Sequence, residues 1–180
     1  MTTPDLSTIR RWHCHPQAVL RNSGDDVLRH SREVQRLAIG LCAHIGYPVY
    51  DGRSRLPEWC LRHDEPEIWF GDWPASICRD PQVAALKSQL EAEYWQRARY
   101  APPVLDAIES LVFQIADKME AYFFARDIGA DLDANGFPDD LARAMRWAVN
   151  LDTAVKAQGE IKRSAVEWLE MRLERAAVVA

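Results

Sequence analysis

Residues 104–127 read VLDAIESLVFQIADKMEAYFFARD and predict the longest helix of the chain. Apolar residues recur along this segment at helical spacing on two sides. One stripe runs from Ile108 to Tyr122, and the other runs from Phe113 to Phe124. A helix that is apolar on two sides packs against neighbours on both. The segment therefore predicts the central helix of a helical fold.

The rest of the sequence also follows helical rather than strand periodicity. Asp25-Asp26 can cap a helix, Pro57 can open one, and Pro66 must kink or end the helix in which it lies. No segment alternates convincingly between apolar and polar residues as a strand does. We therefore expect an all-α fold in which residues 1–180 form one compact helical domain. The predicted helices are residues 27–45, 56–66, 81–100, 104–127, 139–155 and 161–177.

Length, composition and charge exclude several classes of protein. The chain has 180 residues, of which 48% are apolar, and its 22 basic and 27 acidic residues give a net charge of −5. No apolar run approaches the ~20 residues of a membrane span, and the first residues lack the apolar stretch of a secretory signal. The mild acidity argues against non-specific nucleic-acid binding. We expect a cytoplasmic protein that binds neither membranes nor nucleic acid.

Polar side chains occupy positions where the helical pattern predicts burial. His30 lies on the apolar stripe of the first long helix, either as a core histidine bonded to a carbonyl or as a metal ligand. His63 and Asp64 precede the interruption at Pro66, which could turn both side chains towards one point. Asp117 interrupts an aromatic face, and a buried carboxylate requires a cation, either a metal ion or a basic side chain in an ion pair.

Together these residues would supply two imidazoles and two carboxylates from three helices. Such a set suits a divalent ion of intermediate hardness, such as Zn, Co, Mn or Fe, with positions left for water and a phosphate oxygen. The predicted metal ligands are His30, His63, Asp64 and Asp117.

The order of these four residues resembles the metal-binding signature of the HD-domain phosphohydrolases. Residues 62–74, RHDEPEIWFGDWP, resemble the HDxxExxxGDxP stretch of that family. Residues 115–122, IADKMEAY, resemble its ADxxxAY stretch. The longer strings are more specific than the four ligand letters alone.

Two shorter segments resemble one branch of the family, the bacterial 5′-deoxynucleotidases. Residues 9–12, IRRW, are similar to an Arg-Trp motif of that branch, and residues 28–31, LRHS, are similar to its Glu-His-Ser motif. Arg29 stands where the family has glutamate, which affects the surroundings of the metal rather than its ligands. The resemblance covers residues 9–126 and leaves the helices of residues 139–178 unaligned.

The resemblance implies hydrolysis of a small deoxynucleotide. The short, tryptophan-rich chain is most similar to small phage enzymes that remove triphosphate from dATP, found with genomes that contain 2-aminoadenine. It implies conversion of dATP to deoxyadenosine and triphosphate in the host cytoplasm, with Zn, Co or Mn at the His/Asp site and Mg on the phosphates. Two alternatives stay open: a 5′-deoxynucleotidase that releases phosphate from deoxynucleoside monophosphates, and a non-catalytic helical regulatory module.

The resemblance also implies roles for individual side chains. Glu67 would be the general acid/base and Asp72 would accept a hydrogen bond from the deoxyribose 3′-hydroxyl; their alternatives are a solvated surface residue and a turn residue. Trp12 is expected either against the sugar or in the core. The basic candidates could bind phosphates, although surface cations are more often solvated than functional. The candidate substrate-binding residues are Arg11, Trp12, Trp73, Pro74, Arg79 and Lys87.

The C-terminal helices are the candidate surface for self-association. A homo-oligomer, either a dimer or a hexamer, fits the resemblance. The apolar residues that could form its interface are Trp168, Leu169, Leu173, Val178 and Val179.

Overall fold

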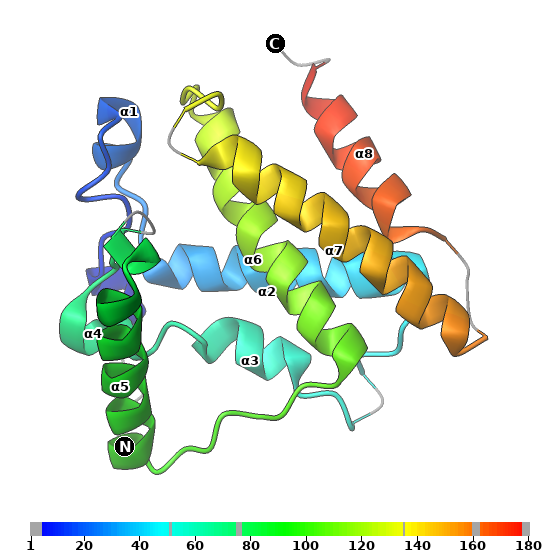
Figure 1. Cartoon of the computed structure of the whole chain (residues 1–180), viewed down its shortest axis with the longest axis horizontal. Helices are drawn as coiled ribbons and strands as arrows, with labels where there is room; N and C mark the ends of the chain where they lie inside the picture. The colour runs from blue at the N-terminus through cyan, green and yellow to red at the C-terminus, as the bar shows by residue number, and fades with distance from the viewer. Residues whose placement is uncertain (1–4, 51, 75–76, 135, 160–162, 178–180) are drawn as a thin grey trace.

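The computed structural model describes residues 5–50, 52–74, 77–134, 136–159 and 163–177. Over these ranges the secondary structure is helical apart from an isolated bridge between Arg10 and Asp26, which confirms the all-α prediction. None of the helices in the described part is both long and apolar enough to cross a membrane. The elements, labelled in Figure 1, are η1 (Leu6–Thr8), α1 (Ala18–Arg21), α2 (Val27–Ile45), α3 (Leu56–Arg62), α4 (Glu67–Phe70), η2 (Ile77–Arg79), α5 (Pro81–Ala98), α6 (Ala107–Asp127), α7 (Phe137–Ala157) and α8 (Ala165–Ala177).

Short polar side chains set where the long helices begin. Asp26 caps α2 by accepting a hydrogen bond from the Arg29 N–H at 2.8 Å, and Gly46 ends the helix with a left-handed φ of 81°. Asp106 and Glu109 form a capping box, in which each side chain accepts a bond from the other residue's N–H. This cap starts α6 at residue 107, three residues later than the apolar pattern predicts.

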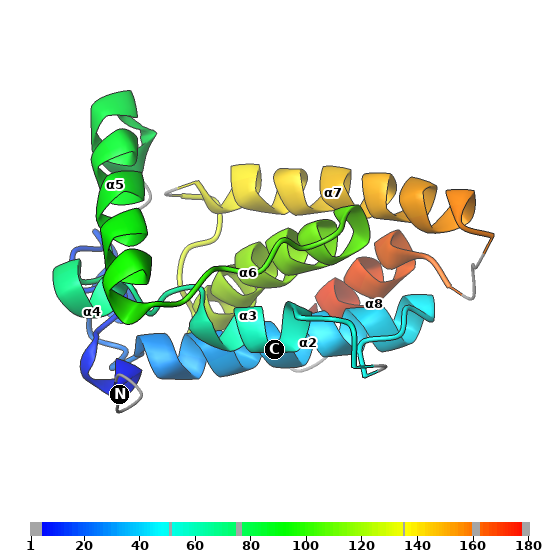
Figure 2. The ribbon, with the colours of Figure 1, turned by 90° about the horizontal axis from the view of Figure 1, so that it is seen from below.

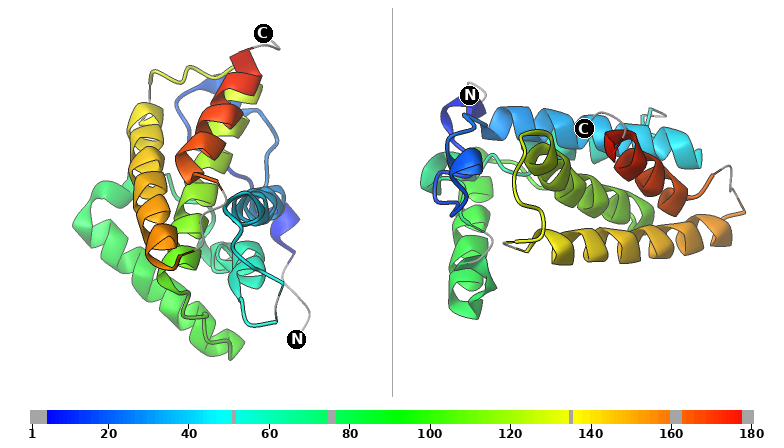
Figure 3. Two further views of the ribbon diagram at one scale, coloured as in Figure 1. Left: turned by 90° about the vertical axis from the view of Figure 1, so that its right-hand side faces the viewer. Right: turned by 90° about the horizontal axis from the view of Figure 1, so that it is seen from above.

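Helix α6 lies at the centre of the bundle and packs against both α2 and α7 (Figures 1 and 2). Helix α8 lies beside α7 and also contacts α2 (Figure 3). The buried core between them is apolar and includes Val34, Leu37, Leu41, Ile45, Ile108, Val112, Ile115, Met119, Ala148, Leu151, Trp168 and Leu169. Burial of this apolar surface is the main stabilisation of the fold.

Helix α5 stands apart from this bundle, roughly crosswise to α2 and α7 (Figure 2). It is attached by aromatic contacts at its C-terminal end. Trp95 packs against Trp59 of α3 with ring centroids 5.9 Å apart, and Tyr94 packs against Trp69 at 5.2 Å. These contacts fix the helix at the end of the molecule where α2 begins, and they bring Lys87 towards α4.

Candidate metal centre

The first turn of α2, the turn after α3 and the middle of α6 bring the four predicted ligands to one point. His30 belongs to the first turn of α2, His63 and Asp64 follow the end of α3, and Asp117 lies midway along α6. His63 Nε2 lies 3.1 Å from Asp64 Oδ2 and 3.7 Å from Asp117 Oδ1. His30 Nε2 lies 3.4 Å and 3.3 Å from the same two oxygens.

The spacing of these atoms fits a divalent metal ion. Histidine nitrogens and carboxylate oxygens bind such an ion at about 2.1 Å, which places neighbouring ligand atoms roughly 3.0 to 3.4 Å apart. The four N···O distances lie in or close to that range. His30, His63 and Asp64 each offer one ligand atom within 4.8 Å of the other two. Asp117 lies outside this mutual group, although its Oδ1 is 3.3 Å from His30 Nε2 and 3.7 Å from His63 Nε2.

Both imidazoles are oriented by their Nδ1 atoms, which leaves Nε2 directed into the centre. His30 Nδ1 lies 2.6 Å from Glu120 Oε2, and His63 Nδ1 lies 3.0 Å from the Cys60 carbonyl oxygen. Since a carbonyl and an ionised carboxylate only accept, Nδ1 carries the proton in both rings. His63 Nε2 is buried and has no hydrogen-bond partner among the described residues. An imidazole held in this way presents its Nε2 lone pair as metal-ligating histidines do.

The chain turn that carries His63 and Asp64 is tighter than an α-helix. Helix α3 ends at Arg62, four residues before the predicted end at Pro66. The Glu67 N–H donates to the Asp64 carbonyl at 3.0 Å, a bond that spans three residues. His63 and Glu67 are four residues apart in the sequence, but they do not lie on one continuous helix. The helix break instead places His63 and Asp64 at the end of α3, where both reach towards α2 and α6.

The histidines and aspartates favour opposite charges. Burial opposes the charge of His63, but the carboxylates of Asp64 and Asp117 outweigh it and raise its pKa to about 9. Burial also opposes protonation of His30, yet its carboxylate partners raise its pKa well above the usual value. Burial also opposes the charge of Asp64 and Asp117, but the two imidazoles outweigh it and hold the pKa of both carboxyl groups well below the usual range. Lys118 acts in the same direction on Asp117. The site attracts positive charge, which protons or a metal ion can supply.

Glu67 is buried beside the centre, so the alternative of a solvated surface glutamate is wrong. Glu67 is 5% exposed, and Lys87 Nζ of α5 lies 3.5 Å from its Oε1. Burial, together with the negative charges of Asp64 and Asp72, raises the pKa of Glu67 to about 9, although Lys87 acts in the opposite direction. In the metal-free protein Glu67 therefore keeps its proton at neutral pH, as a general acid requires.

The segment before α1 holds Trp12 against Asp72. The Trp12 backbone N–H donates to Asp72 Oδ2 at 3.2 Å, and the indole N–H donates to Asp25 Oδ2 at 2.9 Å. Trp12 has a φ of 62°, a strained conformation for a bulky residue. Its half-buried ring stacks on Phe124 with centroids 6.3 Å apart. Trp12 thus packs against the protein while part of it stays accessible.

Trp73, Pro74 and Arg79 lie along the chain that leads from α4 to α5. Trp73 and Pro74 are half-buried, and the Trp73 indole donates to the Phe70 carbonyl at 3.0 Å. Arg79 is exposed, and its Nη2 lies 2.8 Å from the point that a Cβ on Gly136 would occupy. Arg79 therefore lies against the start of α7. The contacts named here are with Phe70 and with the start of α7, and none of them is with a predicted metal ligand.

Sequence reasoning missed two buried carboxylates, Asp25 and Glu120, which are 4% and 3% exposed. Arg11, predicted to bind substrate, is bonded to both through its Nη1, at 3.0 Å and 2.9 Å. Arg29 also contacts both, and its Nη2 lies 2.5 Å from Glu120 Oε1. The available signal was the spacing of Glu120, three residues after Asp117 and hence on the same side of the helix.

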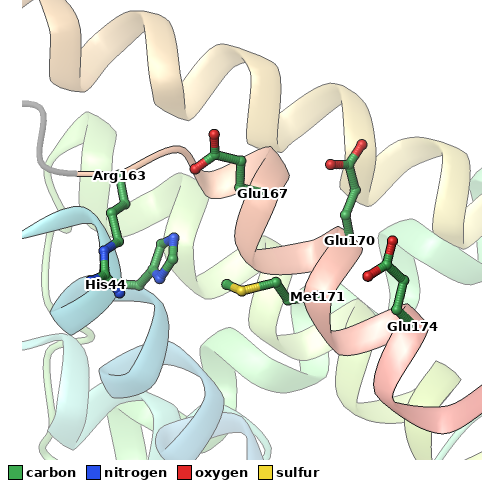
Figure 4. Close-up of a pocket in the computed structure, with 6 residues that line it drawn as sticks. All are labelled: His44, Arg163, Glu167, Glu170, Met171 and Glu174. Atoms are coloured by element: carbon green, nitrogen blue, oxygen red, sulfur yellow. The ribbon is translucent and has the colours of Figure 1, made fainter. Parts of the chain in front are cut away.

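A surface hollow at the other end of α2 contains none of the predicted site residues (Figure 4). It is lined by His44, Arg163, Glu167, Glu170, Met171 and Glu174. Beside it on α8, Trp168 and Leu169 are buried in the core of the chain itself and Leu173 packs partly against that core, whereas Val178 and Val179 lie outside the described residues. Trp168 and Leu169 therefore stabilise the fold.

Comparison of the chain with protein-family models, curated proteins and solved structures finds no match. The site is therefore described by its own geometry: the nitrogen and oxygen atoms of two histidines and two aspartates converge beside the buried carboxyl group of Glu67.

Proposed function

We propose that the protein is a metal-dependent phosphohydrolase of the HD-domain type that acts on deoxynucleoside triphosphates, with dATP as the expected substrate. One observation carries the proposal: four ligand atoms from three helices converge, and both imidazoles are oriented through Nδ1. A divalent ion held by these residues would supply positive charge for a phosphate oxygen and would lower the pKa of a water towards neutrality. The N/O ligand set suits Zn, Co or Mn. Its members are His30, His63, Asp64 and Asp117.

Glu67 supplies the proton that the leaving group needs. When water attacks the α-phosphorus, a new P–O bond forms and the bond from phosphorus to the 5′-oxygen breaks, so the departing oxygen must gain a proton. Glu67 is buried, and burial raises the pKa of its carboxyl group, so it can hold a proton and donate it. Lys87, 3.5 Å away, stabilises the carboxylate that remains.

Basic and aromatic side chains around the centre favour a nucleotide substrate. Lys118 Nζ lies 3.5 Å from Asp117 Oδ2, and Lys87 approaches from α5, so two cations accompany the centre from different helices. They can bind phosphate oxygens, as can Arg79, and Mg can accompany the phosphates. Asp72, held by the Trp12 N–H, can accept a bond from the 3′-hydroxyl. Trp12, Trp73 and Pro74 provide flat apolar surfaces for the sugar and the base.

A substrate panel tests the proposal. The full-length protein is incubated with each canonical dNTP, NTP and dNMP in the presence of Mg, Mn, Co or Zn, and the products are resolved by ion exchange. Tripolyphosphate and deoxyadenosine from dATP are expected. Orthophosphate from dAMP would instead favour the 5′-deoxynucleotidase, which could use the same metal centre. Absence of hydrolysis with metal bound would contradict both and favour the regulatory module. Light scattering on the same sample tests the expected dimer or hexamer.

A further inference from the structure

Glu120 connects one metal ligand to two arginines inside the protein. It lies on α6 one turn beyond Asp117 and is 3% exposed. Its Oε2 accepts hydrogen bonds from His30 Nδ1 at 2.6 Å and from Arg11 Nη1 at 2.9 Å, and its Oε1 accepts one from Arg29 Nη2 at 2.5 Å. Both carboxylate oxygens are therefore used, and one of them orients the His30 ring.

Asp25 completes this group and ties it to the N-terminal segment. Its Oδ2 accepts bonds from Arg11 at 3.0 Å and from the Trp12 indole at 2.9 Å, while its Oδ1 contacts Arg29 Nε. Two guanidinium groups thus balance two carboxylates, and all but Arg29 are buried. Because a buried charge left without a partner is strongly unfavourable, Arg11, Asp25 and Glu120 hold together as a unit.

We infer that Glu120 is a positioning residue that fixes the ring of His30 for metal binding, and that Arg11 and Arg29 hold Glu120 in place for this purpose. The inference rests on the proposed metal centre. A carboxylate that accepts the Nδ1 proton fixes both the tautomer and the orientation of a ligating histidine, and it makes Nε2 a better donor to the metal. The N-terminal segment, through Arg11, thereby contributes to metal affinity without supplying a ligand.

The two histidines differ in how they are oriented. His63 donates to the backbone carbonyl of Cys60, a neutral acceptor that any residue at that position would provide. His30 donates to a charged side chain that belongs to another helix. Substitution of Glu120 therefore alters the support of one ligand only, which makes its contribution measurable.

Glu120→Gln tests the inference, with Glu109→Gln as its matched control. Glu109 is also a buried glutamate of α6, 6% exposed, but it bonds Ser54 and Asp106 at the start of the helix. The Zn²⁺ dissociation constant of each full-length, metal-free variant is measured by titration calorimetry. Loss of an outer-shell carboxylate is expected to weaken Zn²⁺ binding about 10- to 100-fold in Glu120→Gln, and Glu109→Gln should bind as wild type does.

A spectroscopic readout and a second variant separate positioning from folding. In Zn²⁺-loaded protein, the His30 Nδ1–H resonance should be strongly downfield in wild type and Glu109→Gln, and shifted upfield in Glu120→Gln. Arg29→Met, at a side chain that is 39% exposed, removes one support of Glu120 and should weaken Zn²⁺ binding less than Glu120→Gln does. This variant carries the test if Glu120→Gln does not fold.

The outcomes distinguish the metal centre itself from the positioning role of Glu120. If wild type binds no Zn²⁺, the metal centre itself is wrong and the positioning role falls with it. If wild type binds Zn²⁺ and Glu120→Gln matches Glu109→Gln in affinity and in the His30 resonance, only the positioning role is overturned. Unchanged Zn²⁺ affinity in a folded Arg29→Met variant would overturn the part assigned to Arg29.

Discussion

The two ends of helix α2 are buried in opposite ways. From Val34 to Ile45 its buried residues are apolar and pack against α6 and α8. In its first turn His30 is just as buried, at 3% exposed, but it is surrounded by Asp64, Asp117 and other charged groups. One helix therefore serves both an apolar core and a polar centre.

The difference indicates what each end is for. Transfer of apolar side chains out of water stabilises the core directly. Burial of ionisable groups costs free energy that pairing at best offsets, so a cluster of them is weak evidence for stability. Perturbed ionisable groups gathered at one point are instead typical of functional sites. We therefore expect substitutions at the apolar end to change stability and substitutions at the polar end to change metal chemistry.

The largest effect is expected from Asp117→Ala, which removes a ligand at the polar end. Loss of this carboxylate should leave the protein without bound metal after dialysis and without measurable hydrolysis, while the core remains folded. Metal analysis and the dATP assay check both. Asp127→Ala is the control, because Asp127 lies on the same helix with its side chain 63% exposed, paired with Arg126. Equal metal content in Asp117→Ala and wild type would contradict the metal centre.

At the apolar end, Leu41→Ala should change stability and leave the chemistry intact. Leu41 is fully buried in the core, and truncation of such a side chain costs about 2–5 kcal/mol. Urea denaturation measures this loss, and Zn²⁺ titration of the folded variant should give the wild-type affinity. Weaker Zn²⁺ binding without a loss of stability would mean that the two ends are not separate.

Glu67→Gln should have the converse outcome, with lost turnover and retained metal. A general acid contributes roughly 10²- to 10⁴-fold to the rate, and glutamine of the same shape cannot donate the required proton. Steady-state assays should show the fall in kcat, and metal analysis should match wild type. Full turnover in this variant would remove Glu67 from the mechanism.

Metal-free wild type and Glu67→Gln can also be compared for the dependence of their stability on pH. Burial raises the pKa of Glu67 from 4.5 to about 9, so between these values the unfolded chain loses its proton while the folded one retains it. The free energy of unfolding should therefore fall as pH rises from about 5 towards 9. Because Glu67→Gln lacks this titration, its stability should decline less over the same range. Parallel curves from urea denaturation at each pH would contradict the raised pKa.

Much of the apolar end could be predicted from sequence because its signals are local. Asp26 and Gly46 lie next to the helix that they start and end, and the apolar stripe between them repeats at helical spacing. The start of α8 escaped prediction because its cap comes from elsewhere. Asp152 of α7 accepts hydrogen bonds from the Ser164 hydroxyl and the Ala165 N–H, which fixes the start of the helix at residue 165.

At the polar end, the sequence identified polar residues that interrupt an apolar helical stripe. It missed those that lie where a polar residue is ordinary. His30 and Asp117 interrupt apolar stripes, so their spacing marked them. Glu120 reads as an ordinary polar helix position, and its burial depends on Arg11, which lies 109 residues away in the chain. Asp25 was expected to cap α2 together with its neighbour, but Asp26 alone is the cap, and Asp25 is turned inwards to the arginines.

The smallest effect is expected at the rim of the polar end, from Arg79→Ala. The guanidinium of Arg79 is exposed and lies against Gly136, so it can add only a screened attraction to a phosphate chain. Such a contact is worth at most about 1 kcal/mol, or about fivefold in KM for dATP. Arg36→Ala, which removes an exposed arginine paired with Glu33, is the control and should leave KM unchanged. Because the contact is to the outer phosphates, kcat with dATP should not change, and the value of kcat/KM for dAMP should stay at that of wild type. A matching loss with dAMP would place Arg79 at the phosphate common to both substrates rather than at the outer ones.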